Sequence, residues 1–461
     1  MRKIFQAQLT FDDQEFLQAG KFFTKDEELE KISRVLDDSP EILERACQDL
    51  TAGLKNAGNN GMSVEQVLRC AVLYQMKDYS YRELQMRINS DYNYRKFTRF
   101  YSKPVPDFTN LAKAVGSIKP QTYEALNDLL VLYAKDKGLE DGSKVRSDGA
   151  VVQTDIHHPT DSSLLWDSVR VLDRIMNGCR TEYTELQFEY HDRTRVAKKR
   201  SYEITMAKGK GASKKRKKAY RNLLKTSEEV LAMARACRDE LDSMRVSAGW
   251  DINMGALIDE LDHYIPLAEK VIDQCRRRVF EGEEVPAHEK VVSIFEEHTD
   301  IIMRGKTQSP TEFGHKVVIS TGASGIVTQY KVCEGNPSDG DMVGEILDKH
   351  VSIFGDAPDA FAGDRRFYSK ANEELAGSAP YNIEYISIPK PGRRSPERKE
   401  FERAKWFKTL QRFRAGIEGI LSALLRALGL GRCLWSGFRS FRSYVGLSVF
   451  AFNLRKIASL L

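Results

Sequence analysis

The stretch that decides the fold covers residues 144–170 and reads KVRSDGAVVQTDIHHPTDSSLLWDSVR. Its first half, with valines among small residues, predicts a short β-strand. This strand carries one carboxylate, Asp148, which costs free energy there unless it is solvated, hydrogen-bonded or bound to a metal ion. The alternative is a turn aspartate beside Gly149. The second half predicts a loop and then a helix that begins near Thr160 or Asp161, because both residue types cap helices.

After this stretch the hydrophobic period predicts helices first and strands later. Residues 163–281 predict two long helical patterns that flank a basic patch, KKRSYEITMAKGKGASKKRKKAYR, at 198–221. From residue 289 the period becomes two. The first three predicted strands are 291–297, 315–321 and 325–335. A helix is predicted next, at 343–354, followed by a strand ending at Asp364 and a strand at 381–389.

A helical apolar face then covers residues 407–428, and Glu418 lies one position off that face. A glutamate at the edge of such a face is usually a salt-bridge partner. A catalytic role is the alternative, and the residue type alone does not decide between the two.

Two helices are predicted near the N-terminus, within residues 62–100, with a break at 77–79. Ser63 with Gln66 and Ser80 with Glu83 have the spacing of capping boxes. Basic residues on and after the second helix alternate with aromatic ones, which suits phosphate contacts. Most short helix pairs are only scaffolds, so a structural role is the alternative. The basic residues are Arg82, Arg87, Arg95, Lys96 and Arg99.

The composition is that of an ordinary globular protein, with 461 residues, 30% charged residues and a net charge of +5. The basic residues gather at 198–221 and after residue 393, which suits a polyanionic partner, although a solvated face is the plain alternative. Seven scattered cysteines without a CxxC pair argue for a reducing compartment and against a zinc site. The polar N-terminus and the lack of a long apolar run predict a cytoplasmic protein without a membrane span.

The opening stretch resembles the first-aspartate block of the DDE transposases of bacterial insertion sequences, especially the ISNCY-type group. That block has a strand aspartate followed by an "IH-aromatic-PTDS-LL-D" run. The segments DAFAGDRRFYSKANEEL at 359–375 and RFRAGIEG at 412–419 resemble the second-aspartate and glutamate blocks of the same family. The resemblance covers roughly residues 62–461. The matching run here is Ile156, His157, His158, Pro159, Thr160, Asp161, Ser162, Leu164, Leu165 and Asp167.

The resemblance implies a fold that combines α+β and α/β features. Its centre is a ribonuclease-H-like catalytic domain, a mixed sheet with flanking helices, formed by residues 141–170 and 289–461. Residues 171–288 form a large helical insertion with a basic tip, and residues 61–140 form an N-terminal all-α DNA-binding domain. Residues 1–60 are a helical lead-in to which we assign no function.

The resemblance also implies an activity: binding of terminal inverted repeats, followed by Mg²⁺-dependent DNA cleavage and strand transfer. The catalytic residues and metal ligands would be Asp148, Asp364 and Glu418, which would hold two Mg²⁺ ions that Mn²⁺ can replace. Arg414 would bind phosphate or carboxylate. The partners would be double-stranded DNA, from transposon ends and target, and further copies of the chain in a dimer or larger synaptic assembly at the nucleoid. The DNA-binding residues of the basic tip would be Lys214, Lys215, Arg216, Lys217 and Lys218.

Several motif residues depart from the family pattern or have no defined role. His157, His158 and Asp161 are expected to position the turn into the insertion. The two histidines are not expected to bind a metal ion together, because adjacent side chains on an extended segment point apart. Arg366 stands where the family usually has glycine, and we expect its guanidinium to pair with Asp364, with a DNA phosphate as the alternative partner.

Residues 149–150, Gly-Ala, replace the small hydroxyl residues of the family. Together with Arg366, they keep one alternative open, a decayed transposase that binds DNA without cutting it. A structure-selective nuclease of the same fold is a separate alternative, which would cut DNA without joining it.

Overall fold

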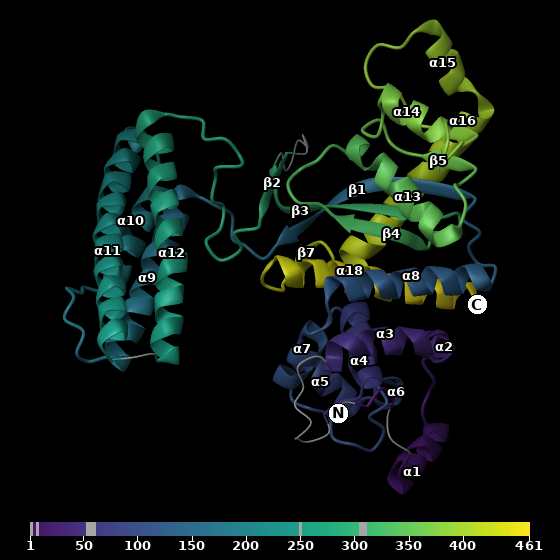
Figure 1. The fold of residues 1–461 in the computed structure, drawn as a ribbon, viewed down its shortest axis with the longest axis horizontal. Coiled ribbons are helices and arrows are strands. Elements are labelled where there is room, and N and C mark those ends of the chain that lie inside the picture. Colours follow the sequence, from purple (N-terminus) through teal and green to yellow (C-terminus); the bar gives the residue numbers. More distant parts are fainter. Residues whose placement is uncertain (1–2, 6–8, 52–60, 249–250, 304–310) are drawn as a thin grey trace. The chain divides into compact units, whose positions relative to one another are not determined.

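The computed structural model describes residues 3–5, 9–51, 61–248, 251–303 and 311–461 (Figure 1). The end of the predicted lead-in, at 52–60, lies outside the described residues. The chain divides into two compact units. The first, here called the sheet unit, comprises Met1–Asp155 and Asp300–Leu461, and the second, the helical unit, comprises Ile156–Thr299. The predicted insertion covered 171–288.

A seven-stranded mixed sheet forms the centre of the sheet unit, in the order β2-β3-β1-β5-β6. β4 also pairs with β3, and β7 also pairs with β1. β1 is antiparallel to β3 and parallel to β5, so it lies where the sheet changes direction. The strands are β1 (Lys144–Thr154), β2 (Asp300–Met303), β3 (Thr311–Thr321), β4 (Val327–Val332), β5 (Ala360–Ala362), β6 (Tyr385–Ser387) and β7 (Arg432–Cys433).

Most predicted strands are confirmed, but the strand predicted at 291–297 is wrong. These residues form bends and turns without a ladder. Ile294 is buried in the core of the helical unit, so the apolar residues of this segment serve packing rather than strand pairing. A short apolar run cannot by itself distinguish these two cases.

The N-terminal helices share one hydrophobic core with one face of the sheet and with the last helix. Both predicted capping boxes are present, at Ser63 and Ser80. The helices are α1 (Phe11–Ala19), η1 (Gly20–Phe22), α2 (Glu27–Asp37), α3 (Pro40–Thr51), α4 (Val64–Lys77), α5 (Tyr81–Ser90), α6 (Tyr92–Phe97), α7 (Phe108–Gly116) and α8 (Pro120–Asp136).

The later helices of the sheet unit cover the other parts of the sheet. α18 is apolar on all sides because it is buried on all sides, packed against α8, α2 and α4. No helix among the described residues is both long and apolar enough to cross a membrane. The helices are η3 (Asp339–Met342), α13 (Val343–Phe354), α14 (Lys370–Gly377), α15 (Pro396–Arg403), α16 (Lys405–Ala415), α17 (Ile417–Ser422), η4 (Ala423–Ala427) and α18 (Phe438–Leu460).

The helical unit has a core of its own, formed by the facing sides of its helices. Thr160 caps the first helix, as predicted. The prediction of two long helices is wrong, because four are present. Gly209 and Gly211 have positive φ angles, which separate the second helix from the third within the basic patch. The helices are α9 (Asp161–Glu182), α10 (Thr194–Met206), α11 (Ala212–Ala248), α12 (Ile252–Arg276) and the π-helical turn η2 (Arg277–Glu281).

Candidate active site

Asp148 lies in the middle of β1, and its side chain is 18% exposed. The backbone N–H of Gly149 donates a hydrogen bond to Asp148 Oδ1 at 2.8 Å. Burial raises the pKa of Asp148, the charges of Asp364 and Asp339 raise it further, and Gly149 and Arg414 act in the opposite direction. Asp148 is therefore a half-buried acid, and two other carboxylates act on it electrostatically.

Asp364 reaches the same region from β5. In the parallel register of β1 and β5, Arg146 pairs with Ala362. Asp148 and Asp364 each lie two residues further along, which is the geometric reason that they approach one another. Asp364 Oδ1 accepts the backbone N–H of Arg366 at 2.8 Å, and this bond shapes the turn after the strand.

Glu418 belongs to the first turn of α17, and Arg414 connects it with the first aspartate. Arg414 Nη1 lies 3.5 Å from Asp148 Oδ2, and Nη2 lies 3.6 Å from Glu418 Oε1. The Glu418 side chain is 69% exposed, whereas that of Arg414 is 20% exposed. Asp148 and Asp364 are thus near enough for the charge of one to act on the other, and Arg414 lies between Asp148 and Glu418.

No three His, Cys, Asp or Glu side chains among the described residues lie together as a metal-binding group. Metal ligation by Asp148, Asp364 and Glu418 stays a prediction. All seven cysteines are free, and six of them are buried.

Asp339 is a site residue that the sequence did not single out. It lies in η3 and is 4% exposed, and Lys316 Nζ on β3 lies 2.5 Å from its Oδ1. A Cβ atom added to Gly149 would lie 2.9 Å from the same oxygen. Gly149 stands where the resembled family usually has a small hydroxyl residue. Because it has no side chain, it leaves room for the Asp339 carboxylate. Its loop, EGNPSDGDMV, has the composition of any turn, so sequence gave no signal for this role.

The expected pairing of Arg366 with Asp364 is not present in the structure. The Arg366 side chain is exposed, and among the described residues it forms no ion pair with Asp364. Its φ angle is not positive, so the position requires no glycine. Asp364 contacts the backbone of Arg366 instead, which leaves its carboxylate charge unneutralised by that side chain.

The other residues of the first motif belong to the helical unit. His157 Nε2 lies 3.3 Å from Asp167 Oδ2, and Arg278 Nη1 lies 2.8 Å from Asp161 Oδ1. His158 is exposed. Burial raises the pKa of Asp167, and the charge of His157 lowers it. These contacts hold α9 and the segment before it within their own unit.

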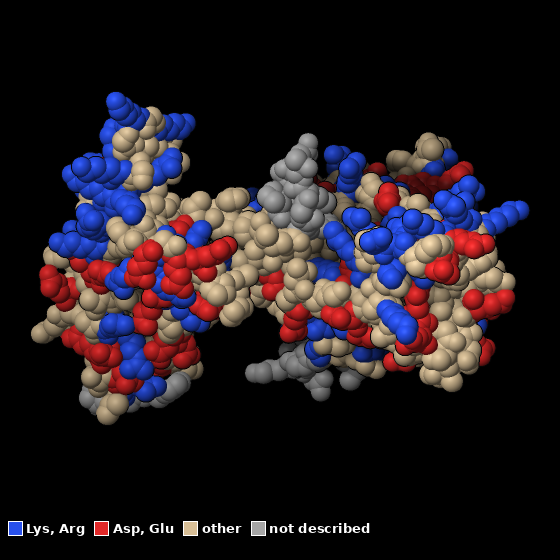
Figure 2. Space-filling model, turned by 90° about the horizontal axis from the view of Figure 1, so that it is seen from above, with Lys and Arg blue, Asp and Glu red and all other residues tan. Residues whose placement is uncertain are grey.

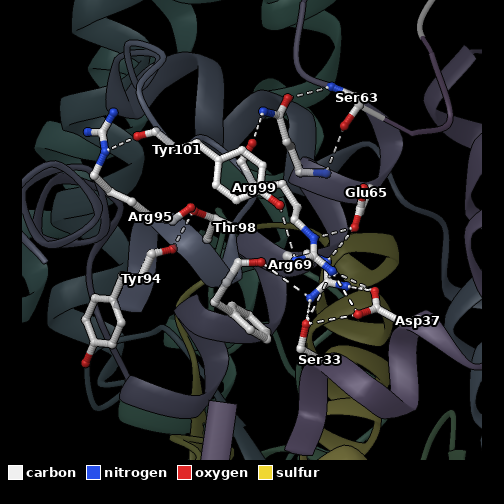
Figure 3. Close-up of polar contacts among 12 residues, drawn as sticks. Ser33, Asp37, Ser63, Glu65, Arg69, Tyr94, Arg95, Thr98, Arg99 and Tyr101 are labelled. Atoms are coloured by element: carbon white, nitrogen blue, oxygen red, sulfur yellow. Dashed lines mark hydrogen bonds and ion pairs between the residues drawn. The ribbon is translucent and has the colours of Figure 1, made fainter. Parts of the chain in front are cut away.

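Three of the five cations predicted for DNA binding near the N-terminus are held by their own domain. Arg99 shares Glu65 and Asp37 with the buried Arg69, as Figure 3 shows. Lys96 forms an ion pair with Glu30 at 2.5 Å, and Arg95 donates hydrogen bonds to the carbonyl oxygens of Tyr101 and Lys103. Buried or paired charges of this kind hold the helices of the domain together.

Arg82 and Arg87 remain exposed on α5. The Arg82 guanidinium lies 4.6 Å from the centre of the Phe108 ring, and that of Arg87 lies 5.9 Å from the Tyr79 ring. Stacking on a ring orients a guanidinium while its N–H groups stay available. These two side chains have the geometry that phosphate contacts need.

The five predicted cations of the basic tip are all exposed at the start of α11. Lys215 and Lys218 line a hollow of about 500 Å³, together with Arg200 and Lys208 of the α10 side. Figure 2 shows blue Lys and Arg side chains gathered over one part of this unit. The tip therefore presents a concentrated positive charge to solvent.

Residues 17–115 match the family model described as "Transposase domain (DUF772)". The chain carries a transposase domain. This match supports a transposase of an insertion sequence, and the finer resemblance to the ISNCY-type DDE group stays a prediction. The match begins within α1, ends in α7 and so crosses the predicted boundary between the lead-in and the DNA-binding domain. Comparisons with curated proteins and with solved structures gave no match.

Proposed function

We propose that this transposase binds the terminal inverted repeats of an insertion sequence and cleaves and joins DNA through Asp148, Asp364 and Glu418. One observation carries the proposal. Asp148 on β1 and Glu418 on α17 both contact Arg414, and the charge of Asp364, which follows β5, acts on Asp148, although the three acids come from distant parts of the sequence. Two aspartates placed near one another beside a central strand repel each other. Such an arrangement is more typical of a functional site than of a structural ion pair.

The donor set suits a hard divalent cation. Asp148 and Asp364 offer only oxygen atoms, and the charge of Asp364 raises the pKa of Asp148. A cation between them would relieve this repulsion. When bound, Mg²⁺ would supply charge stabilisation for the attacking and leaving oxygen atoms of a phosphoryl transfer.

Arg414 is placed to orient the scissile phosphate. Its Nη1 and Nη2 atoms face Asp148 and Glu418, and its Nε is buried without a hydrogen-bond partner in the described part of the chain. A guanidinium binds phosphate oxygens as well as carboxylates, so the Nη atoms can hold a phosphate that lies beside the two acids. Arg414 would thereby hold the phosphodiester beside the two aspartates.

The strand order supports a ribonuclease-H-like fold for this domain. β1, β3 and β4 form an antiparallel meander, and β5 and β6 continue the sheet in parallel with β1. The helical unit is inserted between β1 and β2. We propose that residues 61–140 recognise the transposon ends and that the basic tip holds DNA without sequence preference.

The test uses the full-length protein, Mg²⁺ and a duplex that carries the ends of the element containing the gene. We expect Asp148→Asn, Asp364→Asn and Glu418→Gln each to reduce cleavage at least 100-fold while leaving duplex binding within about threefold. Asp155→Asn is the matched control, because Asp155 is near β1 in sequence but pairs with Arg432 at 2.9 Å. It should cleave normally.

The outcomes separate the alternatives. Full cleavage by Asp364→Asn would remove the proposed site. Binding without cleavage by the unmodified protein would identify a decayed transposase. Cleavage without joined products would identify a nuclease of the same fold.

A further inference from the structure

A second basic surface of the sheet unit lies between α15 and α16, where the two helices border a groove of about 680 Å³. Five cations line it, and Glu402 is its one acid. The cations are Arg394, Lys399, Arg403, Lys408 and Arg412.

The acid of the groove is already neutralised. Glu402 accepts Arg398 Nε at 2.8 Å and Arg394 Nη1 at 2.9 Å, and also the backbone N–H of Lys390. Arg398 is held further by Glu373. Glu402 and Glu373 are thus already paired with Arg394 and Arg398. The other cations of the groove therefore give it a net positive charge.

Four of the groove's cations are exposed and form no ion pair within the described chain. Lys399 and Arg403 are four residues apart on α15, and Lys408 and Arg412 are four residues apart on α16. Like charges at this spacing lie on one face of a helix and repel each other. A surface that accumulates unpaired cations in this way is suited to an anionic partner that runs along it.

Two residues that line the groove connect it with the neighbourhood of the candidate active site. Gln411 lines the groove, and its Nε2 donates hydrogen bonds to the carbonyl oxygens of Ser387 and Gly363, the residue before Asp364. Ala415, at the end of α16, also lines it and follows Arg414. α16 therefore turns one face toward Asp148 through Arg414 and another face toward the groove.

We propose that the α15–α16 groove binds the phosphate backbone of duplex DNA that enters the active site. This inference rests on the proposed function, since it assigns the path of that function's substrate. The contacts are made to phosphates rather than to bases, because lysine and arginine side chains on an open groove supply charge without a fixed hydrogen-bond pattern.

The experiment measures binding of the full-length protein to a fluorescent 30-base-pair duplex of mixed sequence at several salt concentrations. Each neutralised phosphate contact contributes about 0.9 to the slope of log K against log salt. We expect Lys399→Gln/Arg403→Gln and Lys408→Gln/Arg412→Gln each to reduce the slope by about two, and the four substitutions together by three to four.

The matched control is Lys331→Gln/Lys349→Gln. These lysines are half-buried, and Glu345 and Asp128 hold them, so the same loss of charge should leave the slope unchanged. A variant that exchanges lysine and arginine at the four groove positions should keep the slope, which excludes unfolding as the cause. Circular dichroism of each variant verifies the fold.

Three outcomes would overturn the inference: an unchanged slope in the fourfold variant, the same loss in the control, or a loss confined to a duplex carrying the element's own ends. Failure of the proposed function has a different signature. In that case the groove variants would still lose slope, while the unmodified protein would not cleave DNA with Mg²⁺.

Discussion

At the scale of single residues, the main feature is an aspartate that is kept buried beside other acids. Burial, Asp364 and Asp339 all raise the pKa of Asp148. A raised pKa in the folded state means that the protonated form stabilises the fold below the ordinary pKa of aspartate. This contribution is lost as the pH rises through the raised pKa, so ionised Asp148 destabilises the metal-free protein at neutral pH.

We therefore expect Asp148→Asn to melt at a higher temperature than the unmodified protein at pH 7 without Mg²⁺. The difference should shrink toward zero below about pH 4, where aspartate is protonated in both states. Mg²⁺ should raise the melting temperature of the unmodified protein only. Calorimetry with and without Mg²⁺ measures both effects, and an equal response of the two proteins to Mg²⁺ would contradict the metal site.

The sequence singled out individual acids but not their surroundings. Asp148 and Asp364 were predicted because each stands in a recognisable strand block, and their catalytic role stays a prediction. Asp339 could not, because a turn aspartate has the same local pattern whether it faces solvent or a site. The orientation of Arg366 could not be predicted either, since it depends on a turn held by a backbone hydrogen bond.

At the scale of elements, the break between α16 and α17 sets the position of Glu418. The sequence predicted one helical face over 407–428, because the apolar period continues through the break. Arg146 on β1 explains the interruption. Its guanidinium donates to Phe413 O and Thr321 Oγ1 and lies against the Phe413 ring, so it is fixed beneath Gly416. Such a contact between distant segments leaves no trace in a local pattern.

Gly416→Ala and Gly419→Ala test this explanation as a matched pair. A Cβ atom at Gly416 would lie 2.5 Å from Arg146 Nη1, whereas none lies within 4 Å at Gly419. We expect Gly416→Ala to destabilise the protein by about 1–3 kcal/mol and to reduce cleavage. Gly419→Ala should stabilise it by up to about 1 kcal/mol. Chemical denaturation measures both, and equal effects would remove the proposed role of Arg146.

At the scale of the whole molecule, the two units are built around separate hydrophobic clusters, three in the described part of the sheet unit and one in that of the helical unit. The sequence predicted a helical insertion with a basic tip, and the structure has a helical unit at Ile156–Thr299 with exposed cations at the start of α11. The number of helices could not be predicted, because the segment between α9 and α10 carries apolar residues such as Leu186 and Phe188 that pack in the same core as the helices.

We expect residues 156–299 to fold alone, because their core is formed within the unit. The fragment should be strongly helical by circular dichroism and should bind duplex DNA in a salt-dependent manner. Neutralising Lys214, Lys215, Lys217 and Lys218 should reduce the salt slope by up to about four.

The control for the fragment is Arg235→Gln/Arg238→Gln, since Glu269 and Asp262 hold these two arginines. It should leave the slope unchanged. An unfolded fragment, or a slope that survives neutralisation of the tip, would contradict this prediction.

The antiparallel pairing of β1 with β3 also determines the order in which parts of the chain can fold during translation. Gln153 pairs with Gly314, so the ribosome must translate the whole helical unit before the ladder can close. At about 5–20 residues per second this delay lasts on the order of ten seconds, during which β1 has an unsatisfied edge. The helices form from local contacts and fold much faster than such a ladder. Their early folding shortens the flexible span between the two strands and so lowers the entropy cost of bringing them together.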